Sequence, residues 1–346
     1  MAIILNLLLT NIFLAGLCFL ALRYGNPKGK RAIDSLNRLV QFHIPSAVRT
    51  SIVTVFGPKT MKHVDSTVSY VFYERNPLTL YLYLVLAIGG YIAFVLTGYP
   101  HLPNQTLPFA YHQHIGFGLF FLSLFFFLDA ACSNPGFITK SNHARMLAQF
   151  PFDGSVFRKG VICHTCKVEK PARSKHCRMC DVEVARFDHH CIWINQCVGL
   201  GNVKSFLLFI LFNNAMCLYG AYLGLGIVSD MIETEKLTEA WFRDSNSGHR
   251  FKATPYFIFV YLMGREPVLM YVTILCVLIG SFLLLFTWYH WVTLIRKGIT
   301  TNEEDKLKRL PPEARKKFAQ AYDKGSWIGN LTQLWNLKCP YVTNNR

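Results

Sequence analysis

Four consecutive residues, Asp188-His189-His190-Cys191, carry the side-chain types that nucleophilic chemistry at a cysteine requires. A cysteine reacts as its thiolate, a neighbouring histidine can accept the thiol proton, and a carboxylate can fix the tautomer of that imidazole. Because adjacent side chains point in different directions, one histidine can face Cys191 while the other faces a metal ion. From the residue types alone, the alternative that all four residues only build a zinc site stands equal to this one.

Two C-x-x-C pairs precede this run. They are Cys163/Cys166 and Cys177/Cys180, and His176 stands directly before the second pair. Zinc prefers four tetrahedral thiolate or imidazole ligands, and a C-x-x-C turn presents two sulfurs to one ion. Six of the 11 cysteines lie in the segment from Cys163 to Cys197. If the segment faces the cytosol, its thiols stay reduced, so the spacing predicts bound zinc rather than disulfides.

Two zinc ions need eight ligands, so the inventory of donors can be counted. His164 is an inferior donor because it lies inside its own C-x-x-C turn. The nine strong candidates are Cys163, Cys166, His176, Cys177, Cys180, His189, His190, Cys191 and Cys197. Nine donors cannot fill two sites and also supply two reacting groups, so the residue types leave the assignment open at this point.

Membrane spans must position these residues. Of the 346 residues 52% are apolar and only 16% are charged, which argues against a soluble enzyme, and an aromatic content of 14% excludes a disordered chain. A transmembrane helix needs about 20 mostly apolar residues. Five stretches meet this requirement, at residues 2–22, 78–97, 110–132, 205–228 and 269–295. The first is followed rather than preceded by basic residues, so it is predicted to be an uncleaved anchor.

The distribution of charge predicts the orientation of these spans. Residues 23–77, 133–204 and 296–346 each carry a net charge of +6, whereas residues 98–109 carry no charge, 229–268 carry −1, and Asp129 within the third span carries the remaining −1. Cytosolic loops retain the excess of Lys and Arg, so the three basic segments are predicted to be cytosolic. The net charge of +16 therefore reports topology, and nucleic-acid binding is not expected.

The predicted fold class is an α-helical polytopic membrane protein. A four-helix transmembrane core is preceded by an N-terminal anchor span, and a cytosolic zinc-binding cysteine-rich domain with small β-hairpins lies between core spans two and three. The sequon at Asn104 falls in the predicted lumenal loop and is a candidate glycosylation site. The predicted parts are the anchor with its basic segment at 1–77, the first core pair at 78–132, the cysteine-rich domain at 133–204, the second core pair at 205–295 and the cytosolic tail at 296–346.

The motifs of this segment resemble the cysteine-rich domain of DHHC protein S-acyltransferases. The pattern C-x2-C-x9-H-C-x2-C from Cys163 is followed by Arg186-Phe187-Asp188-His189-His190-Cys191-Ile192-Trp193, then by Asn195-Gln196-Cys197-Val198-Gly199 and Asn202. Outside it, Asn134-Pro135-Gly136 is similar to the family's D-P-G, and Thr300-Thr301-Asn302-Glu303 matches its T-T-x-E. Tyr322-Asp323-Lys324-Gly325 with Asn330 and Gln333 resembles its C-terminal contact motif.

The resemblance implies roles for individual residues. It makes Cys191 the acylated nucleophile, His189 its base and Asp188 the group that orients His189. One zinc ion would be held by Cys177, Cys180, His190 and Cys197, and the other by Cys163, Cys166, His176 and a fourth residue. The family has a cysteine at that fourth position, and Glu183 stands there in this chain. Thr300, Thr301 and Glu303 would support the site, Thr301 through Asp188, and Asn330 would pack the tail against the bundle.

The reaction that this resemblance implies is transfer of a long-chain acyl group from palmitoyl-CoA, through acyl-Cys191, to a cysteine of a membrane protein. Two structural zinc ions would shape the domain, and basic residues would attract the CoA phosphates, namely Lys167, Lys170, Arg173 and Lys175. The first span and short tail resemble the five-span fungal branch, which implies the endoplasmic-reticulum membrane and juxtamembrane cysteines of SNARE-like proteins.

Two other functional classes remain as alternatives. A membrane-anchored zinc module that recruits partner proteins needs the zinc sites but not a free Cys191 beside Asp188 and His189. Labelling of Cys191 by acyl-CoA distinguishes this module from the enzyme. A transporter or channel predicts paired ionisable residues at mid-membrane depth, and the predicted spans contain almost none.

Overall fold

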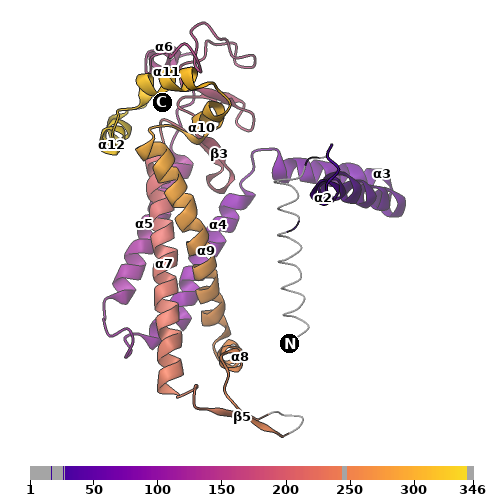
Figure 1. Ribbon diagram of the computed structural model, residues 1–346, viewed down its shortest axis with the longest axis vertical. Helices are drawn as coiled ribbons and strands as arrows, with labels where there is room; N and C mark the ends of the chain where they lie inside the picture. Colours follow the sequence, from indigo (N-terminus) through magenta and orange to yellow (C-terminus); the bar gives the residue numbers. More distant parts are fainter. Residues whose placement is uncertain (1–16, 18–25, 27, 244–247, 341–346) are drawn as a thin grey trace. The chain divides into compact units, whose positions relative to one another are not determined.

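The structure is a computed structural model that describes residues 17, 26, 28–243 and 248–340. The predicted anchor span at 2–22 lies outside the described residues, apart from Leu17. The chain forms two compact units, residues 1–74 and 75–346. The second unit contains the helical bundle and the cysteine-rich domain and is shown in Figure 1.

Four helices among the described residues are long and apolar enough to cross a membrane. They are α4 (Leu78–Thr97), α5 (His112–Cys132), α7 (Val203–Thr234) and α9 (Pro267–Trp291), and they run side by side in Figure 1. A short 3₁₀ turn (η2, Tyr99–His101) extends α4, and a π-helix (η4, Val292–Arg296) continues α9. These helices confirm the four predicted core spans. α7 ends six residues beyond the predicted boundary. The prediction stopped at residue 228 because the last turns of this helix are polar.

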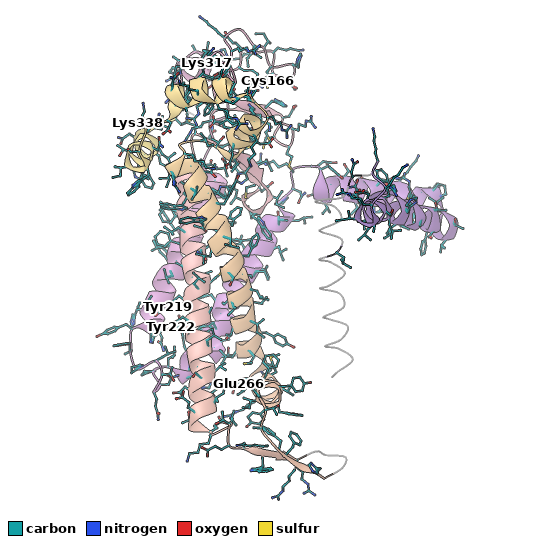
Figure 2. All side chains as sticks on the ribbon, in the orientation of Figure 1. Cys166, Tyr219, Tyr222, Glu266, Lys317 and Lys338 are labelled. Atoms are coloured by element: carbon teal, nitrogen blue, oxygen red, sulfur yellow. The ribbon has the colours of Figure 1, made fainter. Side chains whose placement is uncertain are left out.

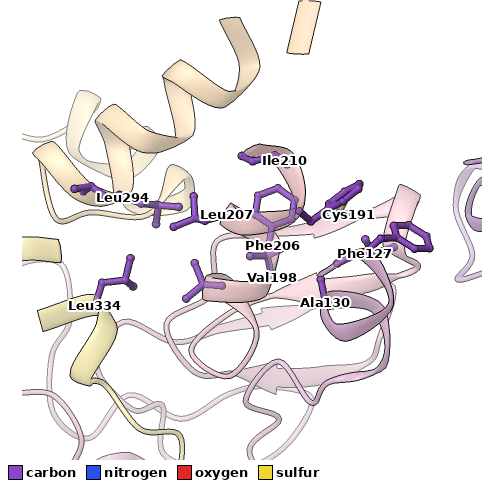
Figure 3. Packing of buried hydrophobic residues seen from close by; sticks show 13 residues of the cluster. Phe127, Ala130, Cys191, Val198, Phe206, Leu207, Ile210, Leu294 and Leu334 are labelled. Atoms are coloured by element: carbon purple, nitrogen blue, oxygen red, sulfur yellow. The ribbon is translucent and has the colours of Figure 1, made fainter. Parts of the chain in front are cut away.

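Helix α7 forms the centre of the bundle and packs against both α5 and α9. Half of its span is buried, compared with 6–22% of the other three spans. Aromatic and aliphatic side chains on its first turns join a cluster that also includes Cys191 (Figure 3). One apolar core therefore joins the segment around Cys191 to α7 at this end of the bundle. A second cluster, around Leu223 and Ile227, fills the other end.

The loop after α7 holds a hairpin of β5 (Trp241–Arg243) and β6 (Arg250–Lys252), followed by α8 (Pro255–Arg265). Thr254 caps α8 by accepting a hydrogen bond from the backbone N–H of Phe257. Ile258 and Leu262 bury against the bundle. Glu266 and Cys166 lie at opposite ends of this unit (Figure 2), so the α8 end is remote from the cysteine-rich domain.

The cysteine-rich domain contains the small hairpins that were predicted. β1 (Lys175–Cys177) pairs with β2 (Val182–Val184), and β3 (His189–Cys191) pairs with β4 (Gln196–Val198). A short helix α6 (His143–Leu147) precedes them, and a 3₁₀ turn (η3, Ile192–Ile194) joins β3 to β4. Gly199 is required here because a Cβ atom would lie 2.5 Å from the carbonyl oxygen of Pro135.

Three helices follow the last span, α10 (Thr301–Lys308), α11 (Pro312–Tyr322) and α12 (Trp327–Asn336). Phe318 and Tyr322 of α11 are buried against aromatic residues of the cysteine-rich domain. On α12, Asn330 is buried and donates a hydrogen bond to the carbonyl oxygen of Arg296, 3.2 Å away. The segment after the last span therefore packs on the cysteine-rich domain and, through Asn330, on the end of η4.

The first unit contains helices that the sequence analysis does not predict. They are α2 (Ala32–Arg38), a π-helix (η1, Leu39–His43) and α3 (Ile44–Phe72). α3 bends sharply at Gly57, whose φ of 84° is outside the helical region, directly before Pro58. The bend brings Arg49 within 2.8 Å of Asp65.

Candidate active site

The alternation of side chains along β3 separates the two histidines of the Asp188-His189-His190-Cys191 run. Successive residues of a strand face opposite sides, so His189 and Cys191 share one face while His190 takes the other. The structure places His190 in a group of metal-ligand donors and leaves Cys191 outside it. Cys191 lies in the apolar cluster at the end of the bundle and is 8% exposed.

Asp188 is held in place by contacts with His189 of β3 and with Thr301 of α10. Its Oδ2 lies 2.7 Å from Nδ1 of His189, and its Oδ1 accepts a hydrogen bond from the backbone N–H of Thr301 at 2.6 Å. The hydroxyl of Thr301 donates to the backbone carbonyl of Asp188 at 3.1 Å. Thr301 is the first residue of α10, so the positive end of the helix dipole faces the carboxylate.

Thr300 and Glu303 form a capping box at the start of α10. The backbone N–H of Glu303 donates to the Thr300 hydroxyl at 3.2 Å, and the Glu303 carboxylate accepts from the backbone N–H of Thr300 at 2.8 Å. The Thr300 hydroxyl also donates to the carbonyl oxygen of Phe187 at 3.1 Å. The T-T-x-E segment therefore contacts Asp188 directly through Thr301. Through Thr300 it also contacts Phe187, the residue before Asp188.

The electrostatic environment favours an ionised Asp188 beside a protonated His189. Burial alone would lower the pKa of His189, but its hydrogen bonds with Asp188 and with Cys191 outweigh that cost and raise the pKa to about 10. Burial opposes ionisation of Asp188 as well, yet the contact with His189 holds the pKa of the carboxyl below its usual value. An imidazolium and the Cys191 thiolate would stabilise each other in this arrangement.

Four donors from two hairpins converge into one candidate metal centre. Cys177, Cys180, His190 and Cys197 place their ligand atoms within 4.8 Å of one another. Nδ1 of His190 lies 3.4–3.6 Å from the three sulfurs. A tetrahedral zinc ion with Zn–S bonds of about 2.3 Å has ligand–ligand edges of about 3.5 to 3.8 Å, so these residues fit zinc.

The second group of donors contains three residues, Cys163, Cys166 and His176. Glu183, which the resemblance implies as a fourth ligand, is not brought into it. Its carboxylate accepts a hydrogen bond from the Ser174 hydroxyl at 2.7 Å and lies 3.4 Å from the ammonium of Lys170. The backbone N–H of Glu183 does contact the Cys166 sulfur. The cysteine that the family has at this position would add a thiolate ligand, whereas the Glu183 carboxylate is engaged by Ser174 and Lys170.

We expect the three-donor group to release metal before the four-donor group. Metal analysis during titration of purified chain with a chelator should show two stages of zinc loss. Glu183→Cys should slow the first stage by about tenfold because it adds a thiolate ligand. Glu183→Gln is the control, since it removes the charge without adding a thiolate. A single stage of loss that Glu183→Cys leaves unchanged would contradict this assignment.

Arg173 has a different position from the one expected for a CoA-attracting surface residue. It is fully buried, and its guanidinium makes two hydrogen bonds of 2.7 and 2.6 Å to the Glu303 carboxylate. The guanidinium carbon also lies 4.8 Å from the centre of the Tyr322 ring. Arg173 therefore joins the cysteine-rich domain to α10 and α11. Lys167 and Lys175 are exposed as expected.

The candidate glycosylation site at Asn104 is held in a folded loop. Its side-chain oxygen accepts a hydrogen bond from the backbone N–H of Leu107 at 2.7 Å, and its amide nitrogen is buried. Backbone N–H groups of Gln105 and Thr106 donate to Asp230 on α7. The folded loop does not present the nitrogen to which a glycan would be attached.

His290 on α9 lies beside Asp188 and His189, a contact that the sequence pattern does not indicate. Its ring centre lies 5.5 Å from that of His189, and its Nδ1 lies 3.9 Å from Oδ2 of Asp188. The available signal was a lone ionisable residue within the apolar stretch 269–295. Because His290 is far in sequence from the Asp188-His189-His190-Cys191 run, the sequence alone does not indicate this contact.

Comparisons with known proteins agree with this geometry. The family model for the DHHC palmitoyltransferase matches residues 156–308, an interval that holds both metal groups and all of α10. Palmitoyltransferase swf1 of Schizosaccharomyces pombe is 32% identical over 328 residues, which cover 92% of this chain and 84% of that protein. Palmitoyltransferase ZDHHC4 of Mus musculus is 32% identical over 246 residues, 69% of each chain. On these similarities the chain belongs to the DHHC palmitoyltransferase family.

Proposed function

We propose that this protein S-palmitoyltransferase carries its acyl group as a thioester on Cys191. The observation that supports this assignment is the pair of contacts around His189, whose imidazole lies between the Asp188 carboxylate and the Cys191 thiol. Cys191 is also the cysteine of β3–β4 that does not belong to a metal group. The activity as a protein-cysteine S-acyltransferase follows from family membership.

The proposed reaction has two thioester exchanges. In the first, the Cys191 thiolate attacks the carbonyl carbon of the acyl-CoA thioester, and the bond from that carbon to the CoA sulfur breaks. The departing CoA thiolate takes the proton from His189. In the second, a substrate cysteine gives its proton to His189 and attacks acyl-Cys191, which leaves as a thiolate. Each step replaces one thioester by another, so no nucleotide hydrolysis is required.

The apolar cluster around Cys191 supports a long-chain donor. Phe127, Phe206 and Phe209 are buried beside it, at the end of the bundle, where spans and cysteine-rich domain meet (Figure 3). An acyl chain gains about 0.8 kcal/mol for each buried CH₂ group. A 16-carbon chain would therefore remain among the helices while its thioester reacts at the membrane surface.

A basic pocket in the cysteine-rich domain is the proposed site for the CoA phosphates. Arg158, Lys170 and Lys306 line it together with Ser174. The ammonium of Lys306 lies 4.7 Å from the centre of the Phe157 ring and is brought there by α10. Cationic side chains of this kind attract phosphate groups and anionic lipid headgroups. Lys170 remains part of this proposal, whereas the buried Arg173 does not.

Zinc, when bound, supplies folding energy and fixes the positions of the strands it joins. The four-donor group would hold one ion between β1–β2 and β3–β4, and the three-donor group would hold a second ion beside β1. The His190 ligand is the residue directly before Cys191, so a fixed His190 restricts where Cys191 lies.

For the acceptor, we propose juxtamembrane cysteines of SNARE-like single-span proteins at the endoplasmic-reticulum membrane. This proposal rests on the likeness to the five-span fungal branch. Purified full-length chain, incubated with alkyne-labelled palmitoyl-CoA, should label single-span proteins that carry a cysteine within a few residues of the span. Variants of those proteins with serine in place of that cysteine are the control. Equal labelling of cysteines far from the membrane would contradict this substrate class.

A further inference from the structure

His290 occupies a largely aromatic pocket in which Asp188 and His189 are polar neighbours. The residue is 3% exposed. The rings of Phe206, Phe286 and Tyr289 surround it at centroid distances of 5.4, 4.4 and 5.4 Å. A leucine or phenylalanine would fill such a pocket without introducing a polar atom. An ionisable residue in a membrane span that contacts a buried carboxylate instead indicates a functional role.

The surroundings of the His290 Nδ1 atom indicate which residue His290 acts on. Among the described residues its Nδ1 is buried and makes no hydrogen bond. Oδ2 of Asp188 lies 3.9 Å from this nitrogen. A buried nitrogen without a partner is costly, and shortening this distance by about 1 Å would create a hydrogen bond. Such bonds are often long in the absence of substrate and tighten when it is bound.

Asp188 has room for this third contact. Its Oδ1 accepts from Thr301, and its Oδ2 accepts from His189. A carboxylate oxygen has two lone pairs, so Oδ2 can accept a second hydrogen bond. Thr301 and His189 approach from α10 and β3, and His290 approaches from the third element, α9.

We propose that His290 is a positioning residue, whose Nδ1–H donates to Asp188 when acyl-CoA is bound. The contact holds the Asp188 carboxylate against His189, so that the opposite nitrogen of His189 stays directed at Cys191. Phe206 packs on both histidines, at 5.2 and 5.4 Å, and keeps water from the carboxylate. This inference rests on the proposed role of Cys191. It predicts an effect on the rate constant of acylation and none on acyl-CoA binding.

Single-turnover acylation by labelled palmitoyl-CoA tests the proposal in the full-length protein. His290→Leu keeps an apolar side chain in the pocket and should lower the maximal rate by about tenfold, with the half-saturating acyl-CoA concentration unchanged. His290→Asn places an amide nitrogen near the Nδ1 position and should stay within about threefold of wild type. His290→Gln places its nitrogen near the other ring position and should be as slow as His290→Leu.

Two controls separate this inference from the proposed function. Thr287→Val removes a buried hydroxyl one turn earlier on α9, which donates to the carbonyl oxygen of Ile210, and should not alter the rate. If Cys191→Ser is labelled like wild type, the proposed function itself fails. If wild type is labelled at Cys191 and His290→Leu retains its rate, or if His290→Asn is as slow as His290→Gln, the positioning role is wrong. Should His290→Leu not fold, the comparison of Asn with Gln decides.

Discussion

Cys191→Ser is expected to lower self-acylation and transfer by at least about a thousandfold, because a serine hydroxyl at this position has no comparable nucleophilicity. The substitution changes one atom in an apolar cluster and removes no donor from either metal group. Zinc content and thermal stability should therefore match wild type. The measurement is incorporation of labelled palmitate into a bond that hydroxylamine cleaves, with wild type and variant at equal concentration.

Cys132→Ser is the matched control for this experiment. Cys132 ends α5 and is exposed, so it is accessible to acyl-CoA without any catalytic arrangement around it. This variant should retain the transfer activity of wild type. Transfer to substrate by Cys191→Ser at a rate near that of wild type would refute the acyl-enzyme mechanism.

Arg173→Ala is expected to destabilise the folded chain by about 3–5 kcal/mol, because it leaves the Glu303 carboxylate buried without its counter-charge. Both side chains of this pair are fully buried, so water cannot replace the lost partner. The loss of contact with the Tyr322 ring adds to the effect. Thermal unfolding of the purified chain and the rate of zinc release should both report the destabilisation.

The exposed pair Arg309–Asp305 is the control for this prediction. Its side chains are 77% and 64% exposed, so Arg309→Ala should change stability by no more than about 0.5 kcal/mol. The double variant Arg173→Met with Glu303→Gln should recover part of the stability, since no charge remains unpaired. Equal effects of Arg173→Ala and Arg309→Ala would show that the buried pair is not a stabilising contact.

The four core spans could be predicted from sequence because length and hydropathy identify helices that are able to cross a membrane. The two C-x-x-C pairs were predicted by spacing, since such a turn brings its two sulfurs together locally, whereas the histidine of each group and Cys197 were assigned by the resemblance. Arg173 could not be placed in this way. Its partner Glu303 is 130 residues away, and a lysine- and arginine-rich loop gives no sign of which side chain is buried. Glu183 was expected to be a ligand from its place in the motif, but its carboxylate contacts Ser174 and Lys170 instead, and a motif does not indicate these neighbouring contacts.

The helices of the first unit and His290 show two further limits. α3 has apolar and polar residues on all sides, so its pattern indicates no buried face. His290 is one polar residue in an apolar stretch, and only the approach of α9 to β3 shows that it contacts Asp188. Contacts between elements that are distant in sequence are the part of the site that needed the structure.

The capping box and the buried pair at the start of α10 also set an order of assembly during synthesis. Asp188 and Arg173 leave the ribosome long before Thr301 and Glu303, and the last two spans must be inserted between these events. Until then the Arg173 guanidinium has no counter-charge, so burial of this residue in the cysteine-rich domain is unfavourable. The contacts of Asp188 with Thr301 and of Arg173 with Glu303 can therefore form only after the final span has been synthesised.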